Sequence, residues 1–221
     1  MRIVLFGGSG MVGQGVLREC LMDEDVNTVI SILRKPTGQR HAKLREIMHA
    51  DFLDYSNLKT QFTGADACFY CLGVSSGGMK EAEYRRLTYD LTLSAGKVLA
   101  DLNRNMVFVY VSGQGTDTTE KGGVMWARVK GETENALLRL PLKAAYMFRP
   151  GLIQPMHGIQ SKTKAYRLLY SLTGPILPLL KRLFPNNVTT TEQVGRAMLK
   201  VAKSGYPKPV LEAKDINSLS A

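Results

Sequence analysis

The sequence predicts an α/β fold of the Rossmann-like type, in which a doubly wound parallel sheet lies between two layers of helices. Short apolar runs alternate with segments of helical periodicity, which is typical of parallel strands joined by crossover helices. A glycine-rich turn follows the first apolar run directly. The 221 residues, 44% hydrophobic and 22% charged, suit one globular domain with a substantial core. We therefore expect residues 1–221 to form a single domain, with residues 154–187 as a substrate-side insertion.

Strands and helices are expected in alternation. The apolar runs predict six strands, at residues 2–6, 28–33, 46–49, 65–72, 106–111 and 143–148. A short edge strand is predicted last, at residues 209–212. Apolar residues at helical spacing predict a helix that starts at Met11 and further helices at 81–104, 125–138 and 191–203, the last capped by a threonine of the run 189–191. Ligands of such sheets bind beyond the carboxyl ends of the strands, so the loops after the strands are the places to look for a site.

The net charge of +10 is concentrated in the C-terminal third of the chain. Between residues 155 and 203, eight basic residues stand against one acid, Glu192. Because no nucleic-acid-binding motif accompanies this charge, we do not expect a nucleic-acid partner. The uncharged run 168–180 contains prolines and is too short to span a bilayer. The apolar stretch 168–184 either caps the sheet, which we favour, or lies on a membrane or in a partner's groove.

The cysteine pattern and the start of the chain both favour a cytoplasmic location. Cys68 and Cys71 have CxxC spacing, but they lie in an apolar run, so we expect them and Cys20 to be reduced core thiols and expect no metal site. The first predicted strand begins at residue 2, which leaves no room for a signal peptide.

The turn after the first strand has the glycine pattern of a dinucleotide-binding loop. Gly7, Gly10 and Gly13 are evenly spaced between a strand and an amphipathic helix. The first glycine allows the tight turn, the second lets the backbone approach a pyrophosphate, and the third lets the helix pack close to the strand. The amides expected to face the phosphates from the helix N-terminus are those of Ser9, Gly10, Met11 and Val12. A purely structural glycine turn is the alternative.

Basic residues at the end of the second strand predict the type of dinucleotide. Many NAD-binding folds have an acid here that accepts from the ribose 2′-hydroxyl, whereas this chain has Arg34 and Lys35. A cation cannot accept that hydrogen bond, but it pairs with a 2′-phosphate. We therefore expect NADP(H) to be preferred over NAD(H), with a solvated basic pair as the alternative. Residues that end the next two strands are also expected along the cofactor, namely Asp51, Phe52, Cys71, Leu72 and Gly73.

These motifs resemble those of an atypical short-chain dehydrogenase/reductase. The resemblance is carried by the glycine loop, Asp51-Phe52, Ser112 ending the fifth strand, Lys130 in the next helix, and Phe148-Arg149-Pro150-Gly151. The short length and the run 129–132, Val-Lys-Gly-Glu, are similar to the small members near the HIV Tat-interacting protein, often labelled NAD-dependent epimerase/dehydratase. The resemblance covers nearly the whole chain. It implies that Lys130, Pro150 and Gly151 also contact the cofactor.

The resemblance implies a Tyr-x-x-x-Lys pair at the catalytic centre. The phenol exchanges a proton with the substrate oxygen, while the ammonium lowers the phenol pKa and holds the nicotinamide ribose. Lys130 and Ser112 match this pattern, but Trp126 occupies the tyrosine position. An indole donates a hydrogen bond and cannot shuttle a proton near neutral pH. Three explanations are open: Tyr84 or Tyr89 is the acid, the reaction needs no phenol, or the protein binds the cofactor without turnover.

The resemblance places the substrate side of the cleft after the sixth strand, at residues 154–187. Tyr166 and Arg167 are the expected substrate contacts there, with Tyr84 from the long helix, and a basic lining suits an anionic substrate. The first hypothesis is an NADP(H)-dependent reductase or epimerase of a small substrate. The alternative is a catalytically inactive NAD(P)H-binding regulatory or interaction protein.

Overall fold

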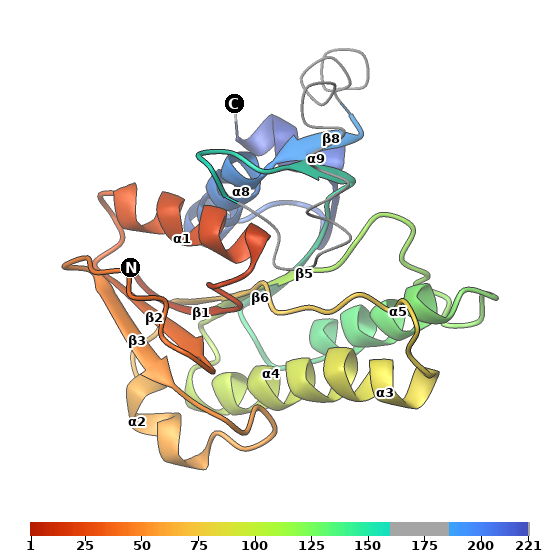
Figure 1. The fold of residues 1–221 in the computed structure, drawn as a ribbon, viewed down its shortest axis with the longest axis horizontal. Coiled ribbons are helices and arrows are strands. Elements are labelled where there is room, and N and C mark those ends of the chain that lie inside the picture. The colour runs from red at the N-terminus through yellow and green to blue at the C-terminus, as the bar shows by residue number, and fades with distance from the viewer. Residues whose placement is uncertain (160–185, 221) are drawn as a thin grey trace.

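Seven parallel strands form the central sheet of the computed structural model, which describes residues 1–159 and 186–220. Their order is β3-β2-β1-β4-β5-β6-β9, and each neighbouring pair is parallel. Strands β2 and β3 extend the sheet to one side of β1, and β4, β5, β6 and β9 extend it to the other, so the sheet is doubly wound (Figure 1). The strands are β1 Arg2–Phe6, β2 Thr28–Leu33, β3 Leu44–Met48, β4 Ala67–Tyr70, β5 Val107–Val111, β6 Ala144–Arg149 and β9 Val210–Glu212.

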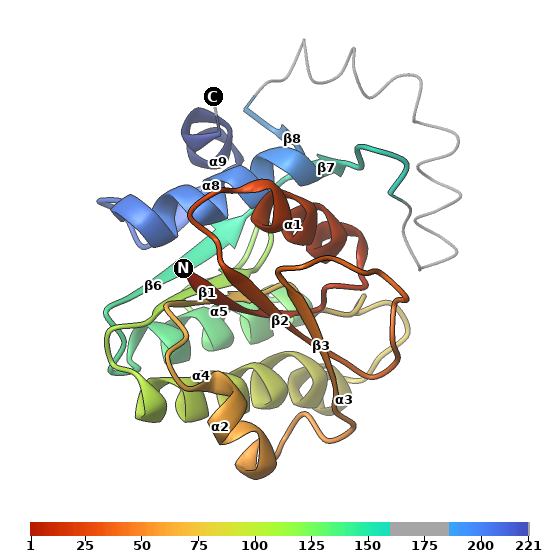
Figure 2. The ribbon, with the colours of Figure 1, turned by 90° about the vertical axis from the view of Figure 1, so that its left-hand side faces the viewer.

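Helices cover both faces of this sheet (Figure 2). One face carries α1, α8 and α9, and the other carries α2 to α5. The bounds are α1 Met11–Met22, α2 Lys59–Phe62, α3 Glu81–Arg85, α4 Leu91–Leu102, α5 Met125–Leu138, α8 Thr191–Ser204 and α9 Ala213–Leu219. The predicted three-layer, Rossmann-like fold is therefore confirmed. Within residues 1–159 and 186–220, no helix combines the length and the hydrophobicity that crossing a bilayer requires.

Strand β1 shows why the sequence gives this arrangement. Ile3 and Leu5 pack into the core shared with α1 and α8, while Val4 and Phe6 pack into the core shared with α4 and α5. All four side chains are completely buried. A strand that is apolar on both sides is stable only where helices cover both faces of a parallel sheet.

Most predicted bounds agree with the structure to within two residues, but the predicted helix at 81–104 is not one regular helix. It consists of α3, a π-helical turn at Arg86–Asp90, and α4. A π-turn changes the hydrogen bonding locally without ending the helix. The pattern of apolar residues therefore remains helical across it.

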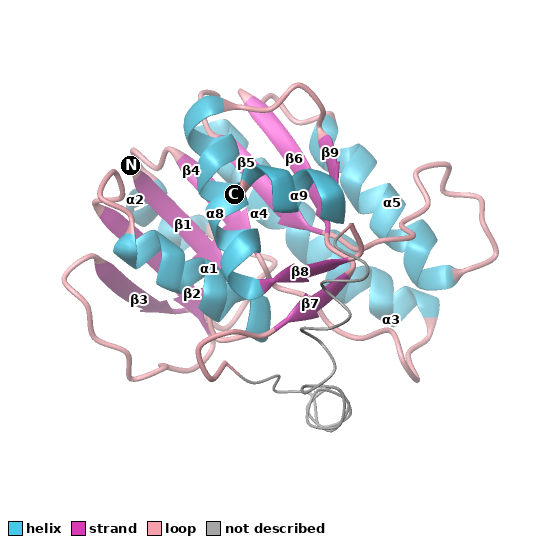
Figure 3. Ribbon diagram, turned by 90° about the horizontal axis from the view of Figure 1, so that it is seen from above, coloured by secondary structure: helices cyan, strands magenta, loops and turns pink. Residues whose placement is uncertain are grey.

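The C-terminal part contains a second sheet that the sequence did not predict. Strand β7, Leu152–Gln154, pairs in parallel with β8, Val188–Thr190, close to α8 and α9 (Figure 3). The predicted threonine cap follows at once: Thr190 Oγ1 accepts from the Gln193 amide at 3.0 Å, and the Gln193 side chain accepts from the Thr190 amide at 3.2 Å. The predicted edge strand is β9, the last strand of the central sheet.

Candidate cofactor site and active site

The loop between β1 and α1 brings three backbone segments into close contact. Gly7 has a φ of 78°, and a Cβ there would lie 2.6 Å from the backbone of Cys71. A Cβ on Gly13 would lie 2.1 Å from the carbonyl oxygen of Gly7. Both positions therefore require glycine, because the loop, the first turn of α1 and the end of β4 meet there.

The N-terminus of α1 faces open space. Gly10 is the N-cap residue and provides no side chain to accept from the first-turn amides. Unpaired amides at a helix N-terminus attract an anion, and the helix dipole adds to the attraction. The predicted phosphate-facing residues that line a cavity at this end are Ser9, Gly10, Met11 and Val12.

Two of the cavities border the glycine loop, and the first of them runs from this loop to the end of β2. It has a volume of about 730 Å³, and Phe52 forms part of its wall. Arg34 and Lys35 line its far end, and within the described residues neither cation forms a hydrogen bond or an ion pair. Glu46 is occupied by Thr37, whose backbone amide donates to its carboxylate at 3.2 Å. The end of β2 therefore presents positive charge without a neutralising partner in the described chain.

The second cavity lies over the carboxyl ends of β4, β5 and β6. Its volume is about 720 Å³, and it shares Gly7, Ser9, Arg34 and Leu72 with the first cavity. Predicted site residues from four separate segments meet in it: Cys71, Gly73, Ser112, Trp126, Lys130, Pro150 and Gly151. The two cavities thus lie next to each other around the glycine loop.

Several predicted site residues lie elsewhere. Tyr84 is buried in α3, with 2% of its surface exposed, and lines neither cavity, so it is not placed to contact substrate. The ring of Tyr89 lies 4.1 Å from the Arg85 guanidinium, also away from the cavities. The Asp51 carboxylate, which was expected along the cofactor, accepts from the Leu53 amide at 2.9 Å within its own turn and lines neither cavity. The remaining substrate candidates, Tyr166 and Arg167, lie outside the described residues.

Lys130 reaches the second cavity from α5, one helical turn after Trp126. Its Nζ lies 5.4 Å from the centre of the Tyr110 ring. Burial lowers the pKa of Lys130 from 10.5 to about 8, although the Glu134 carboxylate acts in the opposite direction. No described residue forms a hydrogen bond or an ion pair with its amine.

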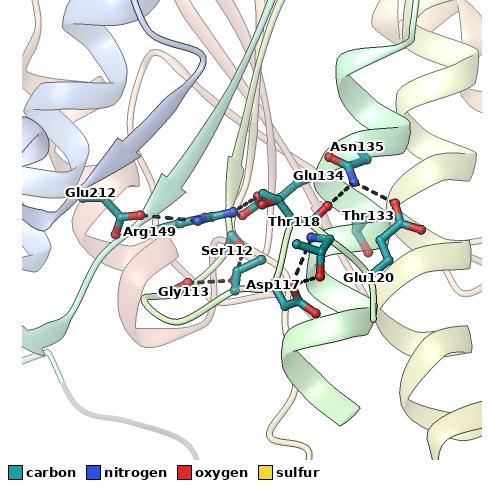
Figure 4. Close-up of polar contacts among 12 residues, drawn as sticks. Ser112, Gly113, Asp117, Thr118, Glu120, Thr133, Glu134, Asn135, Arg149 and Glu212 are labelled. Carbon is teal, nitrogen blue, oxygen red and sulfur yellow. Dashed lines mark hydrogen bonds and ion pairs between the residues drawn. The ribbon is translucent and has the colours of Figure 1, made fainter. Parts of the chain in front are cut away.

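A buried ion pair connects α5 to β6 (Figure 4). Arg149 donates to the two carboxylate oxygens of Glu134 at 3.0 and 2.5 Å, and reaches Glu212 at 3.4 Å. Glu134 is completely buried. Sequence reasoning missed the role of this pair, because the partner of Glu134 depends on how α5 packs against β6. Arg149 holds the charge of Glu134 and so limits its attraction for Lys130.

Ser112 lies at the end of β5 in a short chain of hydroxyl groups. Thr116 Oγ1 donates to the carbonyl oxygen of Gly113 at 2.7 Å and lies 3.0 Å from Ser112 Oγ. A hydroxyl has one proton, and that of Thr116 is given to the carbonyl. Ser112 is therefore the donor in its contact with Thr116.

Sequence reasoning also missed polar and apolar residues of the cavity walls. Thr37 and Gln39 line the first cavity beside the two cations, and Gln114 lines the second. The apolar side chains of the second cavity that were not predicted are Val74, Val111, Leu152 and Ile153. The sequence showed that these residues lie at or after the ends of predicted strands, but it did not show which way their side chains point.

Comparison with known proteins identifies the family. A model described as "NAD dependent epimerase/dehydratase family" matches residues 3–118, which is just over half of the chain. The match includes the glycine loop and β1 to β5, and it ends before α5, where Trp126 and Lys130 lie. The nucleotide-binding half is thus the part that the family model recognises.

Curated relatives of this chain include fungal proteins. The chain is 27% identical over 222 residues to "Leucinostatins biosynthesis cluster protein T" of Purpureocillium lilacinum, with 88% of this chain and 82% of that protein covered. It is 28% identical to "Protein fmp52, mitochondrial" of Emericella nidulans, with 68% and 66% covered. The corresponding protein of Candida albicans is 21% identical and is also named as mitochondrial. These mitochondrial relatives contradict the expected cytoplasmic location, which rested on cysteine usage and the early first strand.

Solved structures show the same fold at low identity. The Bordetella bronchiseptica enzyme WbmF in complex with NAD+ has a TM-score of 0.67 at 15% identity, covering 98% of this chain and 76% of that one. The dTDP-glucose 4,6-dehydratase DesIV of Streptomyces venezuelae, solved with NAD, has a TM-score of 0.69 at 16% identity, with 100% and 80% covered. These likenesses support the Rossmann-like fold.

Proposed function

Because this chain belongs to the NAD dependent epimerase/dehydratase family, we propose that it binds NADP(H) in preference to NAD(H) and reduces a carbonyl group of a small substrate. One observation carries the proposal. Two neighbouring cavities border a glycine loop, with two cations that no described residue pairs at the end of β2 and with Ser112, Trp126 and Lys130 at the other end.

The residues that line the two cavities fit a dinucleotide. The close approach at Gly7 and Gly13 and the open N-terminus of α1 suit the pyrophosphate. Phe52 offers an apolar surface on the adenosine side. Ser112 and Lys130 would then hold the nicotinamide end, and a reduced nicotinamide would supply a hydride there.

Arg34 and Lys35 support the choice of the phosphorylated dinucleotide. Within the described part of the chain neither has an anionic partner, so a 2′-phosphate supplies the charge that the site lacks. A ribose 2′-hydroxyl needs an acceptor at this place, and the Glu46 carboxylate is held by Thr37.

Calorimetry with both dinucleotides tests this choice. We expect Arg34→Ser together with Lys35→Ser to weaken NADPH binding by roughly 10- to 100-fold, the loss expected for charge-assisted hydrogen bonds, and to leave NADH binding nearly unchanged. Arg40→Ser is the matched control, because Arg40 is exposed in the same loop and lines neither cavity. Equal affinity of the wild type for NADH and NADPH contradicts the preference, and no binding of either contradicts the function.

The second cavity suggests the kind of substrate. Trp126, Leu152 and Ile153 give its described wall an apolar character, although the sequence led us to expect an anionic substrate bound by Arg167 and its neighbours. The apolar wall favours a substrate with a hydrophobic or aromatic body beside its carbonyl.

A regulatory role is the second candidate, and Trp126 is the observation that favours it. An indole in the place of the phenol permits cofactor binding without proton transfer. Trp126→Tyr separates the two functions. If the variant gains a reductase activity that the wild type lacks, the regulatory role is supported. If the wild type already turns over, the regulatory role is excluded.

A further inference from the structure

We propose that Lys130 itself gives the proton to the substrate oxygen, in the role that a phenol would have at the position of Trp126. This inference rests on the proposed NADP(H)-dependent reduction. It assigns to Lys130 the release of a proton, beyond the binding of a ribose that the family resemblance implies.

Few described groups in the second cavity can supply a proton. Of the described residues that line it, the ionisable ones are Arg34, Cys71 and Lys130. A guanidinium does not release its proton in a protein. Burial raises the pKa of the Cys71 thiol far above its usual range, so this thiol is a poor acid. Lys130 remains as the acid of this wall that titrates nearest to neutral pH.

Ser112 does not compete for this role in the arrangement described. Its hydroxyl proton is directed to Thr116, because the Thr116 proton is already given to the carbonyl oxygen of Gly113. Ser112 thus offers lone pairs to the cavity. It can accept a hydrogen bond there and help to position a substrate, but another group has to deliver the proton.

The ion pairs of α5 also distinguish Lys130 from the other charged residues of this helix. The helix has four charged side chains, and three are paired with neighbouring elements: Arg128 with Glu81 at 2.8 Å, Glu132 with Arg85 at 2.6 Å, and Glu134 with Arg149 at 2.5 Å. Lys130 is the fourth, and no described residue forms an ion pair with it. Its contacts are the Tyr110 ring from β5 and the field of Glu134, which Arg149 and, beyond it, Glu212 partly offset. An ammonium held this weakly gives up its proton readily.

The proposed reduction adds one hydride and one proton to the carbonyl group. The carbonyl carbon accepts a hydride, with its electron pair, from the bound reduced nicotinamide, and the carbonyl oxygen accepts a proton from Lys130 Nζ. The carbonyl becomes an alcohol, and the cofactor becomes oxidised. Lys130 is left as a neutral amine, which takes a proton from solvent before the next turnover.

The first experiment uses the protein without cofactor and therefore does not depend on activity. Competitive labelling with acetic anhydride modifies only unprotonated amines, and peptide mass spectrometry follows Lys130 across a pH series. We expect a labelling midpoint at about 8, with the exposed Lys97 in the same digest as the reference for reagent reactivity. A midpoint for Lys130 in the range of ordinary lysines, about 10.4, overturns the proposal.

The second experiment measures reduction of para-nitrobenzaldehyde by NADPH, a probe chosen for the apolar wall. We expect the wild-type rate to fall as pH rises through about 8, because the proton donor is lost. Lys130→Arg keeps the positive charge but cannot release a proton, so we expect a loss of at least ~100-fold in kcat with NADPH binding retained. Trp126→Tyr in the Lys130→Arg background supplies a phenol, and we expect it to restore part of the rate.

The outcomes separate the two proposals. A Lys130→Arg variant that keeps the wild-type rate and pH profile overturns Lys130 as the donor. A wild type that binds NADPH but leaves the aldehyde unreduced at every pH also overturns it, while the cofactor site stands. Absence of NADPH binding in calorimetry contradicts the proposed function, and the labelling midpoint in the cofactor-free protein still reports on Lys130 independently.

Discussion

Lys130 occupies a position that disfavours its own charge. Burial lowers its pKa, and Arg149 holds the carboxylate that would otherwise attract the ammonium. The folded protein therefore bears a free-energy cost whenever Lys130 is protonated and the cofactor site is empty. Groups with perturbed pKa values tend to occur at functional sites because chemistry there needs a proton that moves near neutral pH.

This cost predicts a pH-dependent effect of Lys130→Met on stability. The pKa of Lys130 is about 8 in the folded protein and 10.5 in the unfolded chain, so below pH 8 the wild type carries the full cost. We expect the variant to be more stable than the wild type by roughly 1–2 kcal/mol at pH 7, a value reduced for the partial exposure of the side chain.

The advantage of Lys130→Met is expected to shrink as pH rises from 8 toward 10.5, because the unfolded chain then binds more protons than the folded protein. Urea unfolding of both proteins at several pH values measures it. An advantage that stays constant over this window shows that packing, rather than charge, sets the difference.

At the scale of elements, α5 is held by ion pairs of different burial. The Arg149–Glu134 pair to β6 is buried, whereas in the Arg85–Glu132 pair to α3 the two side chains are 40% and 28% exposed. A buried charge that loses its partner is far more costly than an exposed one. Of these two ion pairs, the one with Arg149 therefore contributes more to holding α5 in place, and with it Lys130.

Matched substitutions test this dependence. We expect Arg149→Met to reduce the free energy of unfolding by about 3–5 kcal/mol, because it leaves Glu134 buried and unpaired. Arg85→Met removes one partner of a half-exposed pair and is expected to cost about 0–1 kcal/mol. Denaturant unfolding compares them, and similar losses for the two variants contradict the special weight given to Arg149.

Elements also show how far the sequence allows prediction. Strand β1, the glycine loop and α5 follow from local pattern, since each is marked by apolar periodicity or by glycine spacing. The π-helical turn at Arg86–Asp90 leaves no mark in that pattern. Strands β7 and β8 have three residues each and pair across more than thirty residues of sequence, so neither carries a signal of its own.

The same distinction between local sequence pattern and packing applies to the site residues. Residues named by their place after a strand, such as Ser112 and Gly151, line the cavity as their positions suggested. Tyr84 did not, because the direction in which a helical residue points depends on how the helix packs. The Glu134–Arg149 pair depends on the packing of α5 against β6 and could be recognised only in the structure.

At the scale of the whole molecule, the two cavities lie at the carboxyl ends of the strands, at the point where strand order reverses between β1 and β4. A dinucleotide that fills both cavities touches loops from both halves. Binding there stabilises only the folded protein, so it raises the temperature of unfolding in a concentration-dependent way.

Thermal unfolding with added dinucleotide checks this. At 100 times its dissociation constant, NADPH is expected to add about 2.7 kcal/mol, and for a protein of this size that corresponds to a rise in Tm of roughly 5–10 °C. NADH at the same concentration is expected to give a smaller rise, as is NADPH with the variant that lacks Arg34 and Lys35. An equal rise with both dinucleotides removes the support for the 2′-phosphate contact.

The pairing of β7 with β8 has a consequence for how this fold can diversify. Leu152 pairs with Val188 and Ile153 with Thr189, so the two ends of the intervening stretch of sequence are held together beside the second cavity. A change in the sequence between these strands leaves its two ends at this place as long as the pairing of β7 with β8 is kept. The sequence between β7 and β8 can therefore change during evolution, and a new substrate range can arise while the dinucleotide-binding half stays the same.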